Sequence, residues 1–301
     1  MKNFLALCLI LNCLNTFAQH NFDTVKIRTI QVTESIYMLV GSGGNIGIMI
    51  GKDGTLMIDN QFAPLSNKIN GAIKTLDPAE IRFVINTHLH GDHSGGNENF
   101  TEMGSTVVAH DLVRERMKQG QVTPQMNRTT PPREGDALPV ITFSDRLNFH
   151  LNDEEIELIH FDPGHTDGDV IVKFKNANVF HTGDTYVRHR FPFIDLSSGG
   201  TFAGYISTLD KMLLLMNDQS KIIPGHGELS SKADIKKYRD QLVDMRDLIF
   251  KALKKGKKVE EITSLGISDK YEAELGKNMI KGKDFVLLVA EELKASMPAT
   301  K

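Results

Sequence analysis

The chain has 301 residues, 40% of them hydrophobic and 24% charged, which allows one large domain or two ordinary ones around a sizeable core. Its 35 Lys and Arg against 38 Asp and Glu leave a formal net charge of −3, and this near balance argues against a nucleic-acid-binding protein. No run of about 18 or more apolar residues occurs, so we expect no membrane span.

The N-terminus has the pattern of a secretory signal peptide. Lys2 is followed by an apolar run over Phe4–Leu14, and Thr16-Phe17-Ala18 supplies a small-residue cleavage site. A buried N-terminal helix and a lipid anchor at Cys13 are the alternatives. We expect residues 1–18 to be removed and the mature protein to be exported, either to a periplasm or to the medium.

Both cysteines, Cys8 and Cys13, lie in this N-terminal segment. The mature chain would contain none, so export into an oxidising compartment would require no disulfides. A cysteine nucleophile, a thiolate metal ligand and a disulfide scaffold are therefore excluded together. Any chemistry would depend on oxygen and nitrogen ligands.

In the first half of the chain, short β-type runs separated by glycine-containing turns predict a series of strands. These strands cover residues 25–32, 35–40, 45–50, 55–59, 82–86 and 105–109. Apolar residues at helical spacing predict helices over 65–76 and 111–118. The polar segment Gly120–Leu138 predicts a long loop, which serves either as a lid or as an exposed connector.

The second half repeats this arrangement. Its predicted strands cover residues 140–143, 146–151, 155–161, 169–174, 179–182 and 221–223. Helices are expected over 201–216 and from 231 onward, the last of them over 284–296. Two batches of strands, each closed by helices, predict two packed β-sheets with helices outside. We expect one domain of two similar halves over 19–301, with extra C-terminal helices over about 255–301.

A dense group of histidines follows the strand predicted over 82–86. The sequence Thr87-His88-Leu89-His90-Gly91-Asp92-His93-Ser94-Gly95-Gly96 places three histidines and one aspartate close together. Protonated imidazoles at this spacing would repel one another. Neutral imidazole nitrogens and a carboxylate instead suit Zn²⁺ and, less exclusively, iron or manganese. The segment therefore predicts a metal site.

Four ligands on one turn cannot all reach one ion comfortably. His88 and His90 are two apart in an extended segment and point the same way, whereas Asp92 and His93 follow where a helix begins. We therefore expect two metals, with further ligands after other strands. Three residues have that position, each beside a glycine that lets the backbone turn sharply: His165, Asp184 and His226.

These motifs resemble those of the metallo-β-lactamase superfamily of binuclear metal hydrolases. The matching segments are T-H-L-H-G-D-H-S-G-G at 87–96, G-H-T-D-G-D at 164–169, H-T-G-D-T at 181–185 and P-G-H-G at 224–227. They follow the family's order and spacing over about residues 30–250. The resemblance implies an α/β fold, a four-layer αββα sandwich with the site along one edge. It is far less specific for the substrate.

The resemblance also implies roles for single residues. The implied ligands form two groups and one bridging acid: His88, His90 and His165 for a first zinc ion, Asp92, His93 and His226 for a second, and Asp184 between them. Asp92 would in addition be catalytic, orienting a metal-bound hydroxide that is available at neutral pH. His181, three residues before Asp184, faces either the core of its strand or the metals.

The function implied is hydrolysis of a small carbonyl substrate by that hydroxide. We expect a β-lactam, with a lactonase, esterase or thioesterase, or a non-catalytic metal-binding protein, as the alternatives. The commonest secreted β-lactamases have a cysteine where this chain has Asp184, which weighs against a dedicated β-lactamase.

The loop after Asp184 carries three candidates for binding a substrate: Tyr186, Arg188 and Arg190. A guanidinium suits a substrate carboxylate because it offers planar, bidentate donors. The alternative is that the two arginines are solvated or paired with Asp195 on the surface.

Overall fold

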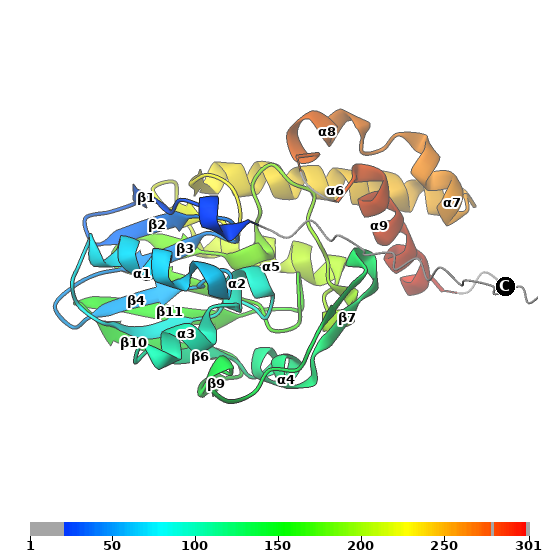
Figure 1. The fold of residues 1–301 in the computed structure, drawn as a ribbon. Coiled ribbons are helices and arrows are strands. Elements are labelled where there is room, and N and C mark those ends of the chain that lie inside the picture. Colours follow the sequence, from blue (N-terminus) through cyan, green and yellow to red (C-terminus); the bar gives the residue numbers. More distant parts are fainter. Residues whose placement is uncertain (1–20, 278–279, 299–301) are drawn as a thin grey trace, which may run out of the picture.

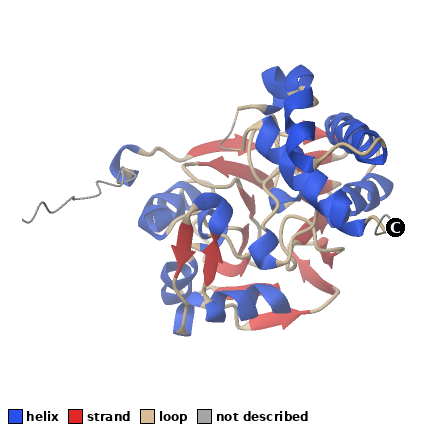
Figure 2. Cartoon of the chain, turned by 90° about the vertical axis from the view of Figure 1, so that its right-hand side faces the viewer, coloured by secondary structure: helices blue, strands red, loops and turns tan. Residues whose placement is uncertain are grey.

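Two β-sheets lie at the centre of the molecule, and helices cover them on both outer sides (Figures 1 and 2). The computed structural model describes residues 21–277 and 280–298. The predicted signal segment, residues 1–18, lies outside the described residues.

The first sheet has seven strands in the order β1-β2-β3-β4-β5-β6-β9. They are β1 Arg28–Gln31, β2 Ile36–Val40, β3 Ile46–Met49, β4 Thr55–Ile58, β5 Ile81–Ile85, β6 Thr106–His110 and β9 Ile141–Phe143. β1 to β4 pair antiparallel, whereas β4, β5, β6 and β9 run parallel. Parallel neighbours need a crossover connection, and the crossover from β5 to β6 carries the His/Asp motif.

The second sheet has six strands in the order β10-β11-β12-β13-β14-β15. They are β10 Arg146–Leu151, β11 Glu154–His160, β12 Val170–Phe174, β13 Val179–His181, β14 Lys221–Ile223 and β15 Ser230–Ser231. Only β13 and β14 pair parallel in this sheet as described. Their crossover is long enough to include a helix on the outer face.

The helices fall into two groups that follow the two sheets. The first group is α1 Ser66–Lys74, α2 Gly91–Ser94, α3 Asn97–Glu102 and α4 Asp111–Gln119. The second group is α5 Phe202–Leu215, α6 Lys232–Lys254, α7 Val259–Ile262, α8 Asp269–Leu275 and α9 Gly282–Ser296. α6 begins at a capping box, in which the Ser231 hydroxyl accepts from the Asp234 amide and the Asp234 carboxylate accepts from the Ser231 amide. Among the described residues, no helix combines the length and apolar character that crossing a membrane requires.

Three apolar clusters hold these layers together. Ile69 of α1 packs with Ile48 on the outer face of the first sheet, and Ile58 packs with Val172 between the sheets. On the outer face of the second sheet, Phe180 packs with apolar residues of α5, α6 and α9. Each fully buried side chain of this size contributes roughly 1.5–3 kcal/mol. The order helix, sheet, sheet, helix confirms the predicted αββα sandwich.

The segment Gly120–Leu138 is not the structureless loop that its polarity predicts. It contains a short antiparallel hairpin of β7 Gln121–Thr123 and β8 Arg128–Thr130, joined through the 3-10 turn η3 Pro124–Met126. Asn127 takes a left-handed conformation (φ 48°), which turns the chain into β8. The Arg133 guanidinium donates to the Ser94 carbonyl oxygen at 2.8 Å and so ties the hairpin to α2.

Candidate metal centre

The His/Asp motif lies where β5 gives way to α2. β5 ends at Ile85, and His90 takes an extended conformation (φ −62°, ψ 146°) as the residue before α2. His88 and His90 therefore belong to the extended connection, whereas Asp92 and His93 belong to the first helical turn. The two pairs therefore start from backbone of different conformation, yet the ring centroids of His88 and His93 lie only 4.2 Å apart.

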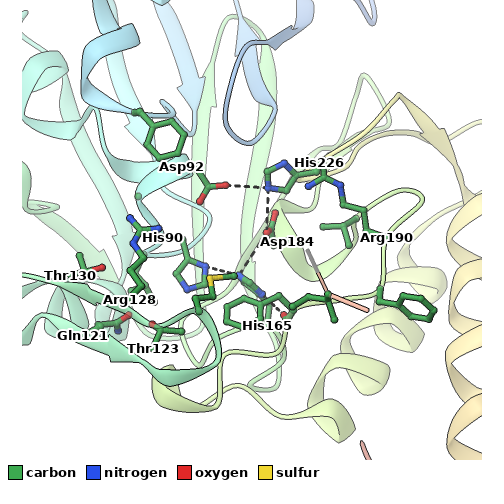
Figure 3. A pocket seen from close by; sticks show the side chains of 18 residues that line it. His90, Asp92, Gln121, Thr123, Arg128, Thr130, His165, Asp184, Arg190 and His226 are labelled. Atoms are coloured by element: carbon green, nitrogen blue, oxygen red, sulfur yellow. Dashed lines mark hydrogen bonds and ion pairs between the residues drawn. The ribbon is translucent and has the colours of Figure 1, made fainter. Parts of the chain in front are cut away.

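The second sheet brings its three predicted ligands to the same edge of the sandwich. His165 lies in the connection from β11 to β12, Asp184 in the 3-10 turn η5 Gly183–Thr185 after β13, and His226 just after β14. Figure 3 shows Asp92 and His226 facing each other, with His90, His165 and Asp184 close by.

The seven side chains form three overlapping groups whose ligand atoms lie within 4.8 Å of one another: His88, His90 and His165; His88, His93 and Asp184; and Asp92, His93 and His226. The first and last match the two predicted ligand groups. The Asp184 Oδ2 atom lies 3.8 Å from His165 Nε2 and 3.5 Å from His226 Nε2, and its Oδ1 atom lies 3.2 Å from His93 Nε2. Asp184 therefore contacts histidines of both groups.

The unpaired atoms of this cluster fit a divalent cation. The Nε2 atom of His88 is buried and has no hydrogen-bond partner in the described part of the chain. The His90 Nδ1 and His165 Nε2 atoms lie 2.9 Å apart, and the His93 and His226 Nε2 atoms lie 3.3 Å apart. Imidazole nitrogens that converge with carboxylate oxygens form the donor set preferred by zinc.

Two buried carboxylates that the motifs do not include orient the histidines. Asp59, at the end of β4, accepts from the Thr87 amide and hydroxyl at 2.8 Å each, and its Oδ2 lies 2.7 Å from His93 Nδ1. Asp195 Oδ2 lies 2.9 Å from His90 Nε2. Partners of this kind fix which ring nitrogen faces the metal.

Close backbone approaches explain the glycines beside these ligands. A Cβ atom on Gly44 would lie 2.1 Å from the His93 ring, and one on Gly225 would lie 2.1 Å from Asp184 Oδ1. Asn45, next to Gly44, donates from its amide group to the carbonyl oxygens of Pro224 and Gly227 at 2.9 and 2.8 Å. The loop that carries His226 is thereby held against the first sheet.

The electrostatics of the centre are also those of a cation site. Burial lowers the pKa of His88 well below its ordinary value, and the nearby His93 lowers it further. Burial acts the same way on His93, but the Asp184, Asp92 and Asp59 carboxylates outweigh it and raise the His93 pKa well above its usual range. Burial tends to raise the pKa of Asp92, yet His93 and His226 together lower it. The carboxylates also outweigh burial at His226 and raise its pKa. The site thus favours ionised carboxylates balanced by positive charge, which a metal would supply in place of protons.

A cavity of about 220 Å³ opens over the ligands. One wall is the β7–β8 hairpin, which contributes Gln121, Thr123, Met126, Arg128 and Thr130. The opposite wall is the loop after η5, which contributes Val187, Arg190, Phe191 and Phe193. The guanidinium groups of Arg128 and Arg190 approach from these two walls (Figure 3). Neither has an ion-pair or hydrogen-bond partner among the described residues.

Of the three predicted substrate-contact residues, the structure places only Arg190 at this cavity. Tyr186 is 2% exposed in the core behind the site, where its ring packs on Tyr238 and its hydroxyl donates to Ser230. Arg188 donates to the Leu229 carbonyl oxygen and lies 3.5 Å from an Asp234 carboxylate oxygen. Against expectation, neither Tyr186 nor Arg188 lines the metal cavity, because their polar groups are held outside it by the partners just named.

The structure also decides between the alternatives left open for His181 and Asp195. His181 is fully buried, and its Nε2 donates to the Asn45 carbonyl oxygen at 3.1 Å, so it faces the core and not the metal groups. Asp195 pairs with His90 and with neither arginine of the loop. It is therefore a residue that positions a metal ligand, and its alternative role as a partner of Arg188 or Arg190 does not occur among the described contacts.

A family model described as the metallo-beta-lactamase superfamily matches residues 39–226. The chain belongs to this superfamily. The match begins in β2 and ends at His226, so all seven predicted ligands lie inside it.

Superfamily members of several kinds are similar to this chain. A probable metallo-hydrolase, MJ0888 from Methanocaldococcus jannaschii, is 24% identical over 64% of this chain and 91% of its own length. A hydroxyacylglutathione hydrolase from Pelagibacter ubique is 27% identical over 56% of this chain and 66% of the relative. The human acyl-coenzyme A thioesterase MBLAC2 is 26% identical over 48% of this chain and 55% of the relative.

The fold is shared with solved metallo-beta-lactamases. The structure of the enzyme from Pontibacter korlensis superposes with a TM-score of 0.59 over 73% of this chain and 100% of its own, at 15% identity. Identity this low carries information on the fold alone.

The Asp195 contact yields a prediction on metal affinity. Asp195→Asn keeps the shape of the side chain but removes the charged acceptor for His90, so we expect zinc to bind about 10–100-fold more weakly. Competition against a chromogenic chelator measures this change. Ser197→Ala is the matched control, because the Ser197 hydroxyl donates to Oδ1 of the same carboxylate without touching a histidine. Equal zinc affinities of wild type and Asp195→Asn would show that His90 needs no such partner.

Proposed function

We propose that the protein is an exported hydrolase that uses two zinc ions to cleave a small carbonyl substrate. The observation that carries this proposal is the convergence of seven His and Asp side chains in two adjoining ligand groups, five of which line an open cavity. Bound zinc would supply Lewis acidity, which polarises a carbonyl oxygen and makes hydroxide available at neutral pH. An open position beside the ligands is typical of a catalytic site, whereas structural zinc sites are closed.

The exposed fraction of each ligand side chain indicates its role. The His93 and His165 side chains are at most 1% exposed and hold their places rigidly, whereas the Asp92 side chain is 27% exposed and borders the cavity. The carboxylate of Asp92 is therefore the group best placed to orient an attacking water and to accept its proton. Asp184, which contacts both groups, fixes their spacing.

The substrate we first expect from the motifs is a β-lactam. A second candidate, an ester, lactone or thioester, is favoured by the sequence relatives, which include a hydroxyacylglutathione hydrolase and an acyl-coenzyme A thioesterase. All of these substrates present a carbonyl carbon to the attacking water. They differ in the leaving atom, which is nitrogen in a β-lactam, oxygen in an ester or lactone and sulfur in a thioester. The zinc-loaded protein should be assayed with a chromogenic cephalosporin, a lactone and a thioester side by side. Turnover of none of them, with full metal content, would support the non-catalytic alternative.

Export is proposed from the N-terminal pattern over residues 1–18. Expression of the full chain in a Gram-negative host, followed by fractionation and N-terminal sequencing, tests it. We expect the mature protein to begin at Gln19 outside the cytoplasm. An intact N-terminus in the cytoplasmic fraction would contradict export.

Arg190 should contribute to the binding of an anionic substrate. Its guanidinium faces the cavity and has no partner within residues 21–277 and 280–298, so it can contact a carboxylate in both the ground state and the transition state. Loss of such uniform binding raises KM and leaves kcat nearly unchanged. We expect Arg190→Ala to raise KM about ten- to hundredfold for an acidic substrate.

The controls for this prediction are a neutral substrate of the same reactivity and the variant Arg188→Ala. Arg188 is paired outside the cavity and should leave KM unaffected. Equal losses for Arg190→Ala on acidic and neutral substrates would mean that this side chain only shapes the loop.

A further inference from the structure

A second cavity adjoins the metal cavity and is larger, at about 570 Å³. Its lining comes from the tip of the β7–β8 hairpin, the chain segment 192–196 and the helix α9. Figure 1 shows β7 and α9 at the same end of the molecule. Its wall is mostly apolar and includes Pro192, Ile194, Leu196, Phe285, Leu287 and Leu288. We call it the α9 groove. Its size lies within the range of small-molecule sites, and apolar lining is typical of such sites.

The α9 groove is continuous with the metal cavity. Four residues line both spaces: Met126, Arg128, Phe193 and Ile280. The ring of Phe193 lies 5.9 Å from the ring centroids of both His90 and His165, and its carbonyl oxygen accepts from His165 Nδ1 at 2.7 Å. The groove therefore begins one side chain away from two candidate metal ligands.

One wall of the α9 groove lies outside the part of the chain that the family model matches. The match ends at residue 226, whereas Phe285, Leu287 and Leu288 belong to α9. The groove is thus built partly by this chain's own C-terminal helix. Leu196 also lines the groove and is 50% exposed. An apolar ligand in the groove would cover this side chain.

We propose that the α9 groove binds the unbranched apolar acyl chain of the substrate while the carbonyl group lies at the metal cavity. The inference rests on the proposed function and narrows its substrate class to esters or thioesters of medium-chain fatty acids. Charge supports an uncharged chain end, because Asp284 and Glu291 border the groove and would repel a terminal carboxylate. Arg128, unpaired at the junction, would then face the polar end of the substrate.

The test is a series of p-nitrophenyl esters from acetate to decanoate, hydrolysed by the zinc-loaded protein. Burial of each methylene favours binding, so kcat/KM should rise about fourfold per added carbon until the chain fills the groove. The double variant Leu196→Gln with Leu287→Gln should flatten this dependence, so that the decanoate ester loses most of its advantage over the acetate ester. Leu214→Gln is the matched control, because Leu214 is 86% exposed and lines neither cavity.

Binding measured without turnover gives a second readout. In calorimetric titrations of the metal-free protein, octanoate should bind at least tenfold more tightly than butanoate, and the double variant should lose this preference. Thermal melting checks that the variant is folded. If every ester is hydrolysed with one kcat/KM and octanoate shows no preference, the groove is not an acyl subsite. If no ester is hydrolysed but octanoate still binds preferentially, the proposed catalytic function fails and the apolar subsite stands.

Discussion

Asp92→Asn is expected to lower kcat by about 10²–10⁴-fold while the protein remains folded. The Asp92 Oδ2 atom lies 3.3 Å from His226 Nε2 and 3.7 Å from His93 Nε2, and the side chain is the most exposed carboxylate of the cluster. Asparagine has the same size but neither the charge nor the basicity needed to orient and deprotonate water. Steady-state kinetics on whichever substrate is turned over, together with thermal melting, measures both effects.

The matched control is Asp136→Asn, since Asp136 is exposed in the turn η4 Gly135–Ala137, outside the three ligand groups. Metal content must be measured on the same samples. Loss of activity with full zinc content would assign Asp92 to the chemical step, whereas loss of one zinc would assign it to metal binding. Turnover close to that of wild type would contradict both roles.

Removal of the metal should have an effect of similar size. We expect a strong chelator to lower activity about 10³-fold, because Lewis acidity supplies several kcal/mol of transition-state stabilisation. Two ligand groups predict that activity returns as two equivalents of zinc are added, and that elemental analysis of protein purified without chelator approaches two ions per chain.

Single-ligand variants refine this prediction. His90 belongs only to the group with His88 and His165, and His226 only to the group with Asp92 and His93. His90→Ala and His226→Ala should therefore each lower the metal content by about one ion. Exposed His150 on β10 offers a control substitution, His150→Ala, with no expected change. A firm plateau at one ion for the wild-type protein in excess zinc would overturn the binuclear assignment.

The sequence predicts most of the architecture and the seven side chains that converge because both depend on strong local patterns. Strands such as β4 and β12 are short apolar runs that each follow a glycine-containing turn, and their predicted ends fall within one residue of the observed ones. The ligands lie on backbone that turns sharply after a strand, where glycine neighbours mark the position. Such signals are contained in a few consecutive residues.

Contacts between distant segments could not be predicted in this way. Asp59 reaches His93 across 34 positions and Asp195 reaches His90 across 105, and each is a single carboxylate with no motif around it. The burial of Tyr186 in the core could not be predicted either. The direction of a side chain after a 3-10 turn follows no sequence periodicity. The β7–β8 hairpin was missed because three-residue strands of polar side chains are too short for alternation to be visible.

The origin of the ligands also bears on stability. The first sheet supplies the four residues of the 88–93 segment, and the second sheet supplies His165, Asp184 and His226. A bound ion would therefore link the two halves of the chain, and it would do so only in the folded state. At a free metal concentration one hundred times the dissociation constant, each such site adds about 2.7 kcal/mol to the free energy of unfolding. Loss of the metal would then lower both the stability of the sandwich and the activity of the site. The melting temperature would therefore depend on the free metal concentration around the protein.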